Sequence, residues 1–215
     1  MTDIGQITLT AAAGVSVLAF LPVLTQFVDL FPELWASMFR TAVCIRIDDS
    51  RKTQRNRDVV FYACIPALIT TVWMSGMYAP ARTEALSAPL QLLVCAGAVL
   101  GYMLLRAAMG RMLPRRRFKP KVYAAAIGSS RNFWTLLSFL LFLSETVLRT
   151  AGADYDLSLI IMYCITGVSY ALYIIRRFQI FASDSNYLTA ILYLCALEIL
   201  PTAILATSAV VLSVT

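Results

Sequence analysis

Long uninterrupted runs of apolar residues recur along the whole chain. A run of about 20 apolar residues is long enough to cross the hydrocarbon core of a bilayer as an α-helix. Because six such runs are present, we predict an all-α polytopic membrane protein with six transmembrane helices. The predicted spans are residues 8–28, 59–78, 89–109, 133–148, 156–175 and 189–212. Since they occupy most of the chain, residues 1–215 are predicted to form a single membrane domain.

One segment near the N-terminus has a different pattern. Over residues 33–47 apolar side chains recur at helical spacing, but charged residues interrupt them, and Trp35 is a residue type that favours membrane interfaces. We therefore predict one amphipathic helix lying on the membrane surface at residues 33–47. Residues 48–58 are predicted to be a charged connection, and residues 110–132 the longest polar connection.

The composition excludes a soluble globular protein. Apolar residues make up 60% of the chain and charged residues 14%, whereas soluble domains have about 45–50% and about 25%. The formal net charge is +6, with 18 lysines and arginines against 12 acidic residues. In a membrane protein such an excess is first a signal of topology.

The positions of the cationic residues predict the orientation. Most of them precede the second span, surround the connection between the third and fourth spans, or follow the fifth span, and all of these segments lie on one side of the membrane. Arg82 and Arg149 fall on the other side. Because cytoplasmic loops carry the excess of Lys and Arg, the basic loops are predicted to be cytoplasmic and both termini to lie outside the cytoplasm. Residues 1–6 lack Lys and Arg, so the first apolar run is expected to be a span rather than a signal peptide.

The sequence offers little of the chemistry that enzymes use. It contains no His, and its five cysteines form no CxxC pair, so neither a metal site nor a disulfide framework is predicted. No phosphate-binding loop, dinucleotide-binding motif or nucleophile elbow is present. We therefore predict a protein without enzymatic activity, cofactor or metal.

Glu198 is the outstanding polar residue, because it lies near the middle of the last predicted span. An ionised carboxylate there costs several kcal/mol, so it must be protonated, paired with a cation or exposed to a water-filled cavity. Pro201 frees a backbone carbonyl one turn earlier, and Cys195, Glu198 and Thr202 are predicted to share one helix face. Two hypotheses follow: a proton, cation or substrate site, or a packing contact with a neighbouring helix, which we favour.

A second carboxylate, Glu145, lies toward the outer end of the fourth predicted span. Arg149 follows it four residues later, which is the spacing of an ion pair on one helix face. We predict an interfacial ion pair between these two residues rather than a functional site.

Small residues at helical spacing predict close helix packing in the third and fifth spans. Gly97 and Gly101 form a GxxxG pattern, and Gly167 begins a similar pattern. Such patterns allow two helix backbones to approach closely. Packing within the chain is favoured over dimerisation, because a bundle of six helices needs such contacts.

A basic patch occupies the connection between the third and fourth spans. Its cations are Arg111, Arg115, Arg116, Arg117, Lys119 and Lys121. Anionic lipid would attract each of them with roughly 1 kcal/mol. A protein partner or a ribosome-bound RNA could use the same charges, but we favour anionic lipids of the bilayer and expect no nucleic-acid partner.

The C-terminal third contains the string Tyr187-Leu-Thr-Ala-Ile-Leu-Tyr-Leu-Cys-Ala-Leu-Glu-Ile-Leu-Pro201, with Arg176 and Arg177 before it. This YLCxLEIxP-like motif resembles the signature of an uncharacterised family of small polytopic inner-membrane proteins of the Bacteroidetes. The resemblance extends from about Val59 onward. It implies a bacterial inner membrane, so the termini that the basic loops place outside the cytoplasm are expected in the periplasm, and it supplies no activity or mechanism.

Taken together, these features favour a non-enzymatic membrane subunit or scaffold that works inside a larger inner-membrane assembly with other membrane proteins. The predicted spans contain too few charged and polar residues for most pumps. The alternative is a small proton- or ion-coupled transporter that uses Glu198 at mid-membrane. A lipid-modifying enzyme is a third and weaker hypothesis.

Overall fold

The computed structural model describes residues 3–78, 86–112, 120–183 and 186–214. Every regular element in these ranges is a helix, which confirms the predicted all-α class. Six helical segments are long and apolar enough to cross a membrane. They are Ile4–Ser37, Arg51–Met74, Ala88–Arg111, Val122–Thr150, Tyr155–Ala182 and Tyr187–Thr207.

Large apolar side chains cover the outside of the bundle. Leu18, Leu104 and Leu188 are each more than two thirds exposed, and many other Leu, Ile and Val side chains are exposed as well. Water would disfavour so large an apolar surface, whereas lipid tails would solvate it. Together with the six apolar helices, this surface identifies a membrane protein.

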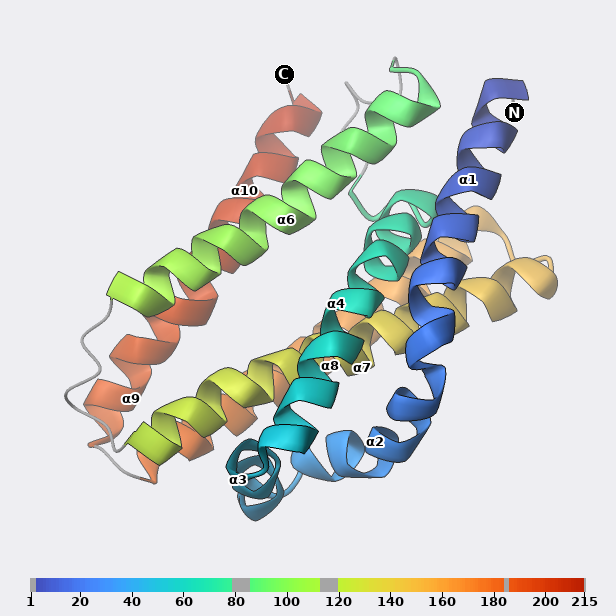
Figure 1. The fold of residues 1–215 in the computed structure, drawn as a ribbon. Helices are drawn as coiled ribbons and strands as arrows, with labels where there is room; N and C mark the ends of the chain where they lie inside the picture. The colour runs from blue at the N-terminus through green and yellow to red at the C-terminus, as the bar shows by residue number, and fades with distance from the viewer. Residues whose placement is uncertain (1–2, 79–85, 113–119, 184–185, 215) are drawn as a thin grey trace.

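The first span is longer than predicted and changes direction. It consists of α1 (Asp3–Phe20), a 3₁₀ turn η1 (Leu21–Val23) and α2 (Leu24–Ser37). Figure 1 shows α2 turning away from the direction of α1. Pro22 lies in the 3₁₀ turn, and it cannot supply the backbone N–H of a regular helix.

A separate short helix follows the first span, as predicted, but its predicted bounds, residues 33–47, are wrong. The first residues of this range end α2 at Ser37, and the rest lies in a separate helix, α3 (Thr41–Asp49). Arg40 between them has an extended backbone (φ −127°, ψ 116°). Leu34 of α2 and Cys44 of α3 are almost fully buried, whereas Trp35 is 48% exposed, so part of the amphipathic pattern reflects packing within the protein.

The basic connections are mostly helical rather than irregular. α4 runs from Arg51 to Met74, and the hydroxyl of Ser50 caps it by accepting from the backbone N–H of Thr53. The predicted connection at residues 48–58 therefore belongs largely to α3 and α4. After α6 (Ala88–Met112), α7 begins at Pro120 and continues to Thr150, so the predicted polar connection at residues 110–132 is wrong over its second half.

The last two spans form long rods. α8 covers Tyr155–Ala182. The C-terminal rod consists of α9 (Tyr187–Leu194), a five-residue π-helical turn η3 (Cys195–Ile199) and α10 (Leu200–Val214). α7 and α8 run antiparallel to each other, while α6 lies beside α10 (Figure 1).

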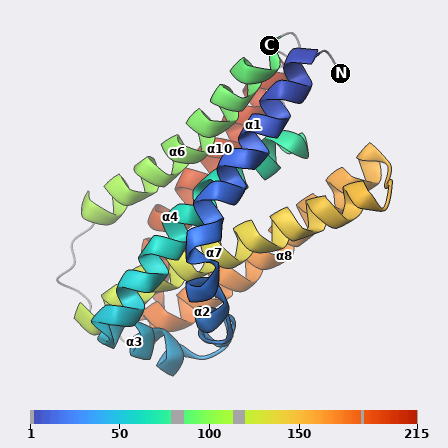
Figure 2. The same cartoon turned by 45° about the vertical axis from the view of Figure 1, so that its right-hand side comes forward.

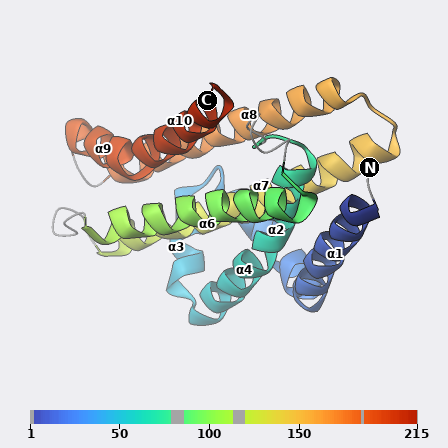
Figure 3. The same cartoon turned by 90° about the horizontal axis from the view of Figure 1, so that it is seen from above.

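The two ends of the bundle differ in charge. The start of α4, the end of α6, the start of α7 and the end of α8 gather at one end, which we call the basic end (Figure 1). The beginning of α1 and the end of α10 lie close together at the opposite end of the bundle, as Figure 2 shows. Seen from above in Figure 3, α6 lies over part of α7, with α4 and α1 on one side of them and α8 with the C-terminal rod on the other. The arrangement brings α6, α8 and the C-terminal rod together around one point.

Candidate functional site

Glu198 lies in the π-helical turn η3 and is fully buried. The turn is π-helical because the backbone N–H of Leu200 donates to the carbonyl of Cys195, five residues earlier. Pro201, which has no N–H to continue the ordinary pattern, follows directly and is buried. The departure from α geometry therefore falls beside the proline, and it places a carboxylate inside the bundle.

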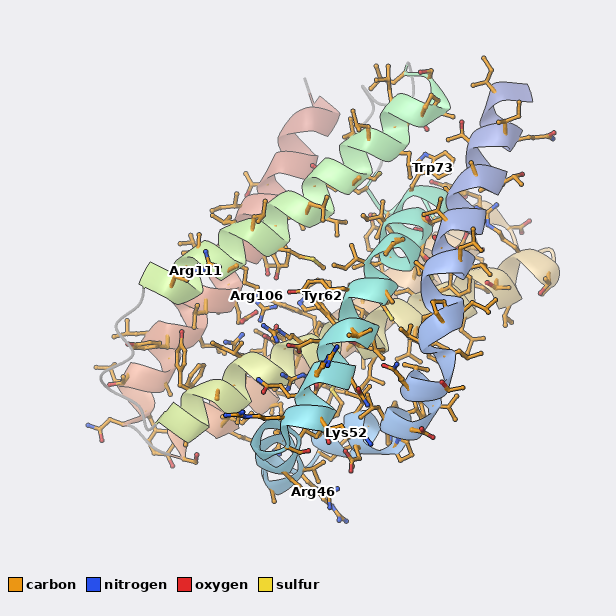
Figure 4. The ribbon with its side chains drawn as sticks, in the orientation of Figure 1. Arg46, Lys52, Tyr62, Trp73, Arg106 and Arg111 are labelled. Carbon is orange, nitrogen blue, oxygen red and sulfur yellow. The ribbon has the colours of Figure 1, made fainter. Side chains whose placement is uncertain are left out.

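Two arginines from different helices pair with this carboxylate. Nη2 of Arg106, on α6, lies 2.5 Å from Oε1 of Glu198, and Nη1 of Arg177, on α8, pairs with the same oxygen. The side chains of Arg106 and Arg177 are only 11% and 3% exposed. Of the three states open to a buried carboxylate, the structure shows the paired one. Arg106 extends from α6 into the interior of the bundle (Figure 4).

Tyr173 joins the two arginines. Its phenol oxygen accepts a hydrogen bond from Arg177 at 2.6 Å and another from Arg106. Both guanidinium groups also lie near its ring, with the carbon of Arg106 5.4 Å and that of Arg177 5.8 Å from the centroid. The ring stacks on Phe133 of α7 at a centroid distance of 4.4 Å. We call Arg106, Tyr173, Arg177 and Glu198 the Glu198 cluster.

A group of hydroxyls holds the backbone beside the cluster. Thr202 donates to the carbonyl of Glu198 at 2.7 Å, and Tyr170 donates to the same carbonyl at 3.2 Å. Tyr170 and Tyr102 also bond with the hydroxyl of Thr202, at 2.9 and 3.3 Å. These contacts link the C-terminal rod to α6 and α8 a second time, so the position of Glu198 is fixed from both its side chain and its backbone.

The predicted shared face of Cys195, Glu198 and Thr202 is only partly correct. Glu198 and Thr202 do lie together. Cys195 is exposed, whereas Glu198 is fully buried. A π turn holds more residues than the 3.6 of an α turn, so residues three apart no longer lie above one another across it. Cys195 is therefore not part of the candidate site.

The charges of the Glu198 cluster do not balance. Two guanidinium groups, which stay protonated in proteins, meet one carboxylate, so the cluster carries one excess positive charge. Among the described residues, Oε2 of Glu198 and Nε of Arg177 are buried without a hydrogen-bond partner. A buried excess charge is costly unless another group compensates it. The arrangement is therefore suited to receive an anionic group.

A second ion-pair group, which the sequence analysis missed, lies at the basic end. Asp58 of α4 pairs with Nε of Arg57 at 3.2 Å and with Nη1 of Arg131 of α7 at 2.5 Å. Next to it, the amide nitrogen of Asn132 donates to the hydroxyl of Ser37 at 3.0 Å. We call Arg57, Asp58 and Arg131 the Asp58 cluster. It was hidden in the sequence because both arginines were counted as loop cations.

The predicted ion pair between Glu145 and Arg149 is confirmed. Nε of Arg149 lies 2.6 Å from Oε1 of Glu145, and Nη2 of Arg149 donates to the carbonyl of Met74 at 2.7 Å. The pair therefore ties the C-terminal end of α7 to the C-terminal end of α4.

The predicted packing role of three glycines is wrong within the described residues. A Cβ atom added at Gly97, Gly101 or Gly167 would meet nothing within 4 Å. All three glycines lie on exposed faces of α6 and α8, so the bundle does not use them for close helix contacts. Their exposed positions agree with the alternative interpretation of the pattern, a contact with another chain.

The basic patch lies mostly outside the described residues. Arg111 is exposed near the end of α6, where Figure 4 labels it. Lys121 lies in the first turn of α7. Arg115, Arg116, Arg117 and Lys119 fall in the range that the structure does not describe. In the described residues no group of three or more His, Cys, Asp or Glu side chains is placed to hold a metal ion.

Comparison with protein-family models found one match, a domain of unknown function (DUF4271), over residues 9–208. Because the match covers nearly the whole chain, the protein belongs to this family. The match begins well before Val59, so the family likeness extends further than the sequence analysis found. Comparisons with curated proteins and with solved structures found no match.

Proposed function

We propose that this member of the DUF4271 family is a non-enzymatic subunit or scaffold of a larger membrane assembly. The observation that carries the proposal is the state of Glu198, which is enclosed and paired with two arginines. A carboxylate held in this way joins α6, α8 and the C-terminal rod. It is poorly placed to take up and release a proton or a cation, because the two guanidinium groups repel a further positive charge.

The cavities of the bundle support the same proposal. One lies between α1, α4 and α7 and is lined by Phe20, Cys64, Phe139 and other mainly apolar residues. A second lies between α4, α6, α7 and α8 and is also mainly apolar. Glu198 lines neither of them. An ion-coupled transporter would need the carboxylate to face a hydrated pathway.

The exposed glycines of α6 suggest where a protein partner could bind. Gly97 and Gly101 lie one helical turn apart on the outside of the bundle, and no described residue would come within 4 Å of a Cβ added at either. Another membrane helix could approach this face closely. We therefore expect the partner to be a membrane protein that contacts α6.

Purification from native membranes in mild detergent, followed by mass spectrometry, tests the proposal. We expect a partner at constant stoichiometry, and a lower yield of it when Gly97 and Gly101 are both replaced by Ile. Gly14→Ile is the matched control, because Gly14 is also exposed and without neighbours on α1. An isolated chain that carries protons or ions into proteoliposomes would instead support transport.

For location, we propose the bacterial inner membrane with the basic end in the cytoplasm and both termini in the periplasm. The excess of Lys and Arg in the segments at the basic end supports this orientation. Cysteines introduced at Arg111 and at Ala151, which is exposed next to the end of α7, should react in a cysteine-free variant with impermeant reagents from opposite sides. Labelling of position 111 from the periplasm would overturn the orientation.

A further inference from the structure

We infer that the Glu198 cluster and the apolar cavity beside it bind one anionic phospholipid, with its phosphate near the arginines and one acyl chain in the cavity. This inference does not depend on the proposed scaffold role. It follows from the charge of the cluster, from the place of the cavity along the same helices, and from the depth of both in the bundle.

The first argument is charge. Arg106 and Arg177 share a single carboxylate, and one positive charge is left over among buried side chains. Oε1 of Glu198 takes both ion pairs, and among the described residues Nε of Arg177 is buried without a hydrogen-bond partner. A phosphate oxygen is the natural acceptor for such an unused guanidinium donor. Binding a monoanionic phosphate would bring the local charge to zero.

The second argument is the cavity, which has a volume of about 180 Å³. Its lining is almost wholly apolar and comes from α4, α6, α7, α8 and α10. Tyr102, Met103, Trp134, Leu137 and Leu205 are among the lining residues. The acyl chain of a membrane lipid can fill such a space without loss of hydrogen bonds, because it is wholly apolar.

The cavity and the cluster adjoin each other through Tyr102. The ring of Tyr102 lines the cavity, and its hydroxyl bonds with Thr202, which in turn donates to the backbone of Glu198. Arg106 follows Tyr102 by one turn on α6. A ligand with a charged head and an apolar tail would therefore meet Arg106 and the cavity on adjacent turns of α6.

A buried hydroxyl lies at the wall of the cavity. Oγ1 of Thr166, on α8, lines the cavity and has no hydrogen-bond partner among the described residues. Buried hydroxyls are rarely left unpaired. Thr166 precedes Arg177 by 11 residues, about 16 Å along α8, so it would lie beside the acyl chain rather than beside the ester groups of the lipid.

The depth of the two features matches the shape of a lipid. Arg106 is six residues from the end of α6 at Met112, and six residues of helix span about 9 Å. Arg177 is a similar distance from the end of α8 at Ala182. The cluster thus lies close to the headgroup region of the basic end, and the cavity extends from it toward Met77 and Tyr78 at the opposite end of α4.

Quenching of tryptophan fluorescence by brominated lipid tests the inference. Trp134 lines the cavity, so in a variant with Trp35→Phe and Trp73→Phe it reports what the cavity contains. The protein would be placed in phosphatidylcholine nanodiscs with increasing fractions of brominated phosphatidylglycerol or brominated phosphatidylcholine. We expect phosphatidylglycerol to reach half-quenching at an about fivefold lower fraction, the ratio for roughly 1 kcal/mol per neutralised cation.

Two variants test recognition of the lipid headgroup and binding of the acyl chain separately. Arg106→Gln leaves Glu198 paired with Arg177 and should remove the preference for phosphatidylglycerol while the protein stays folded. Val99→Phe should fill the cavity and lower quenching by both lipids, whereas Leu100→Phe, on the exposed side of α6, should change neither. Equal quenching by the two lipids in the parent variant, in which the Glu198 cluster is intact, would overturn the inference. Competition by inorganic phosphate alone would also overturn it, because a free anion would then be the ligand.

Discussion

The Glu198 and Asp58 clusters have the same charges and different surroundings. Each has two arginines and one carboxylate, and each joins separate helices. The carboxylate of Glu198 is fully buried, whereas that of Asp58 is 29% exposed. Water can therefore compensate a broken pair at Asp58 but not at Glu198. Although the two clusters contain the same charges, breaking an ion pair should therefore cost more stability in the Glu198 cluster than in the Asp58 cluster.

Breaking the deeper cluster should have the largest effect. Glu198→Gln keeps the shape of the side chain but leaves two buried arginines without a countercharge, and the loss of unfolding free energy should be about 3–5 kcal/mol. This differs from the tolerance expected of a carboxyl that only packs. Unfolding by heat or denaturant in detergent measures the change. Stability equal to the parent would show that Arg106 and Arg177 find other partners.

Removing one arginine from the same cluster should cost less. In Arg106→Gln the remaining pair of Arg177 and Glu198 is neutral, so the loss is that of the hydrogen bonds of one guanidinium, about 1–2 kcal/mol. The double variant Arg106→Gln with Glu198→Gln should be more stable than Glu198→Gln alone, because one buried charge fewer is left unpaired. A double-mutant cycle measures this coupling, and strictly additive losses would argue against it.

The Asp58 cluster should respond more weakly and depend on salt. Asp58→Asn should lower the unfolding free energy by about 1 kcal/mol, because the partly exposed carboxylate gains less from pairing. The difference between variant and parent should shrink as ionic strength rises. A loss as large as that of Glu198→Gln, independent of salt, would show that the two clusters are equivalent.

A surface pair gives the lower limit of the series. Nη2 of Arg46 lies 3.3 Å from Oε1 of Glu33, and the Arg46 side chain is 68% exposed. It extends away from the bundle in Figure 4. Arg46→Ala should change the unfolding free energy by at most about 0.5 kcal/mol. The same unfolding experiment measures it, and a change above that of Asp58→Asn would reverse the proposed dependence on burial.

The sequence predicted the spans well and their basic ends poorly. Apolar runs are a local property, and the six predicted spans all have helices in the structure. The start of α7 was missed because its polar residues looked like a loop, although Arg131 pairs with Asp58 and Asn132 bonds with Ser37. Such partners lie far away in the chain, so no local pattern predicts that a polar segment will be helical and packed.

The candidate site was only half visible for the same reason. Glu198 is conspicuous because nothing else in its span is charged. Its partners, Arg106 and Arg177, lie near the ends of their helices, where long cationic side chains can reach the headgroups. The apolar residues after Arg177, including Ile180 and Phe181, were the available signal, since they show that α8 continues past the arginines.

The π-helical turn has a consequence for how the C-terminal rod meets its neighbours. Before the turn, α9 packs against α8, where Tyr193 contacts Phe181; after it, α10 packs mainly against α6, although Thr202 bonds with Tyr170 of α8 as well as with Tyr102 of α6. One additional residue in a helix rotates everything downstream by about 100°. The turn thus rotates α10 relative to α9, so that different faces of the same rod contact α8 before the turn and α6 after it. Deletion of one residue from Cys195–Ile199 would cancel the offset and turn the downstream stripe toward lipid.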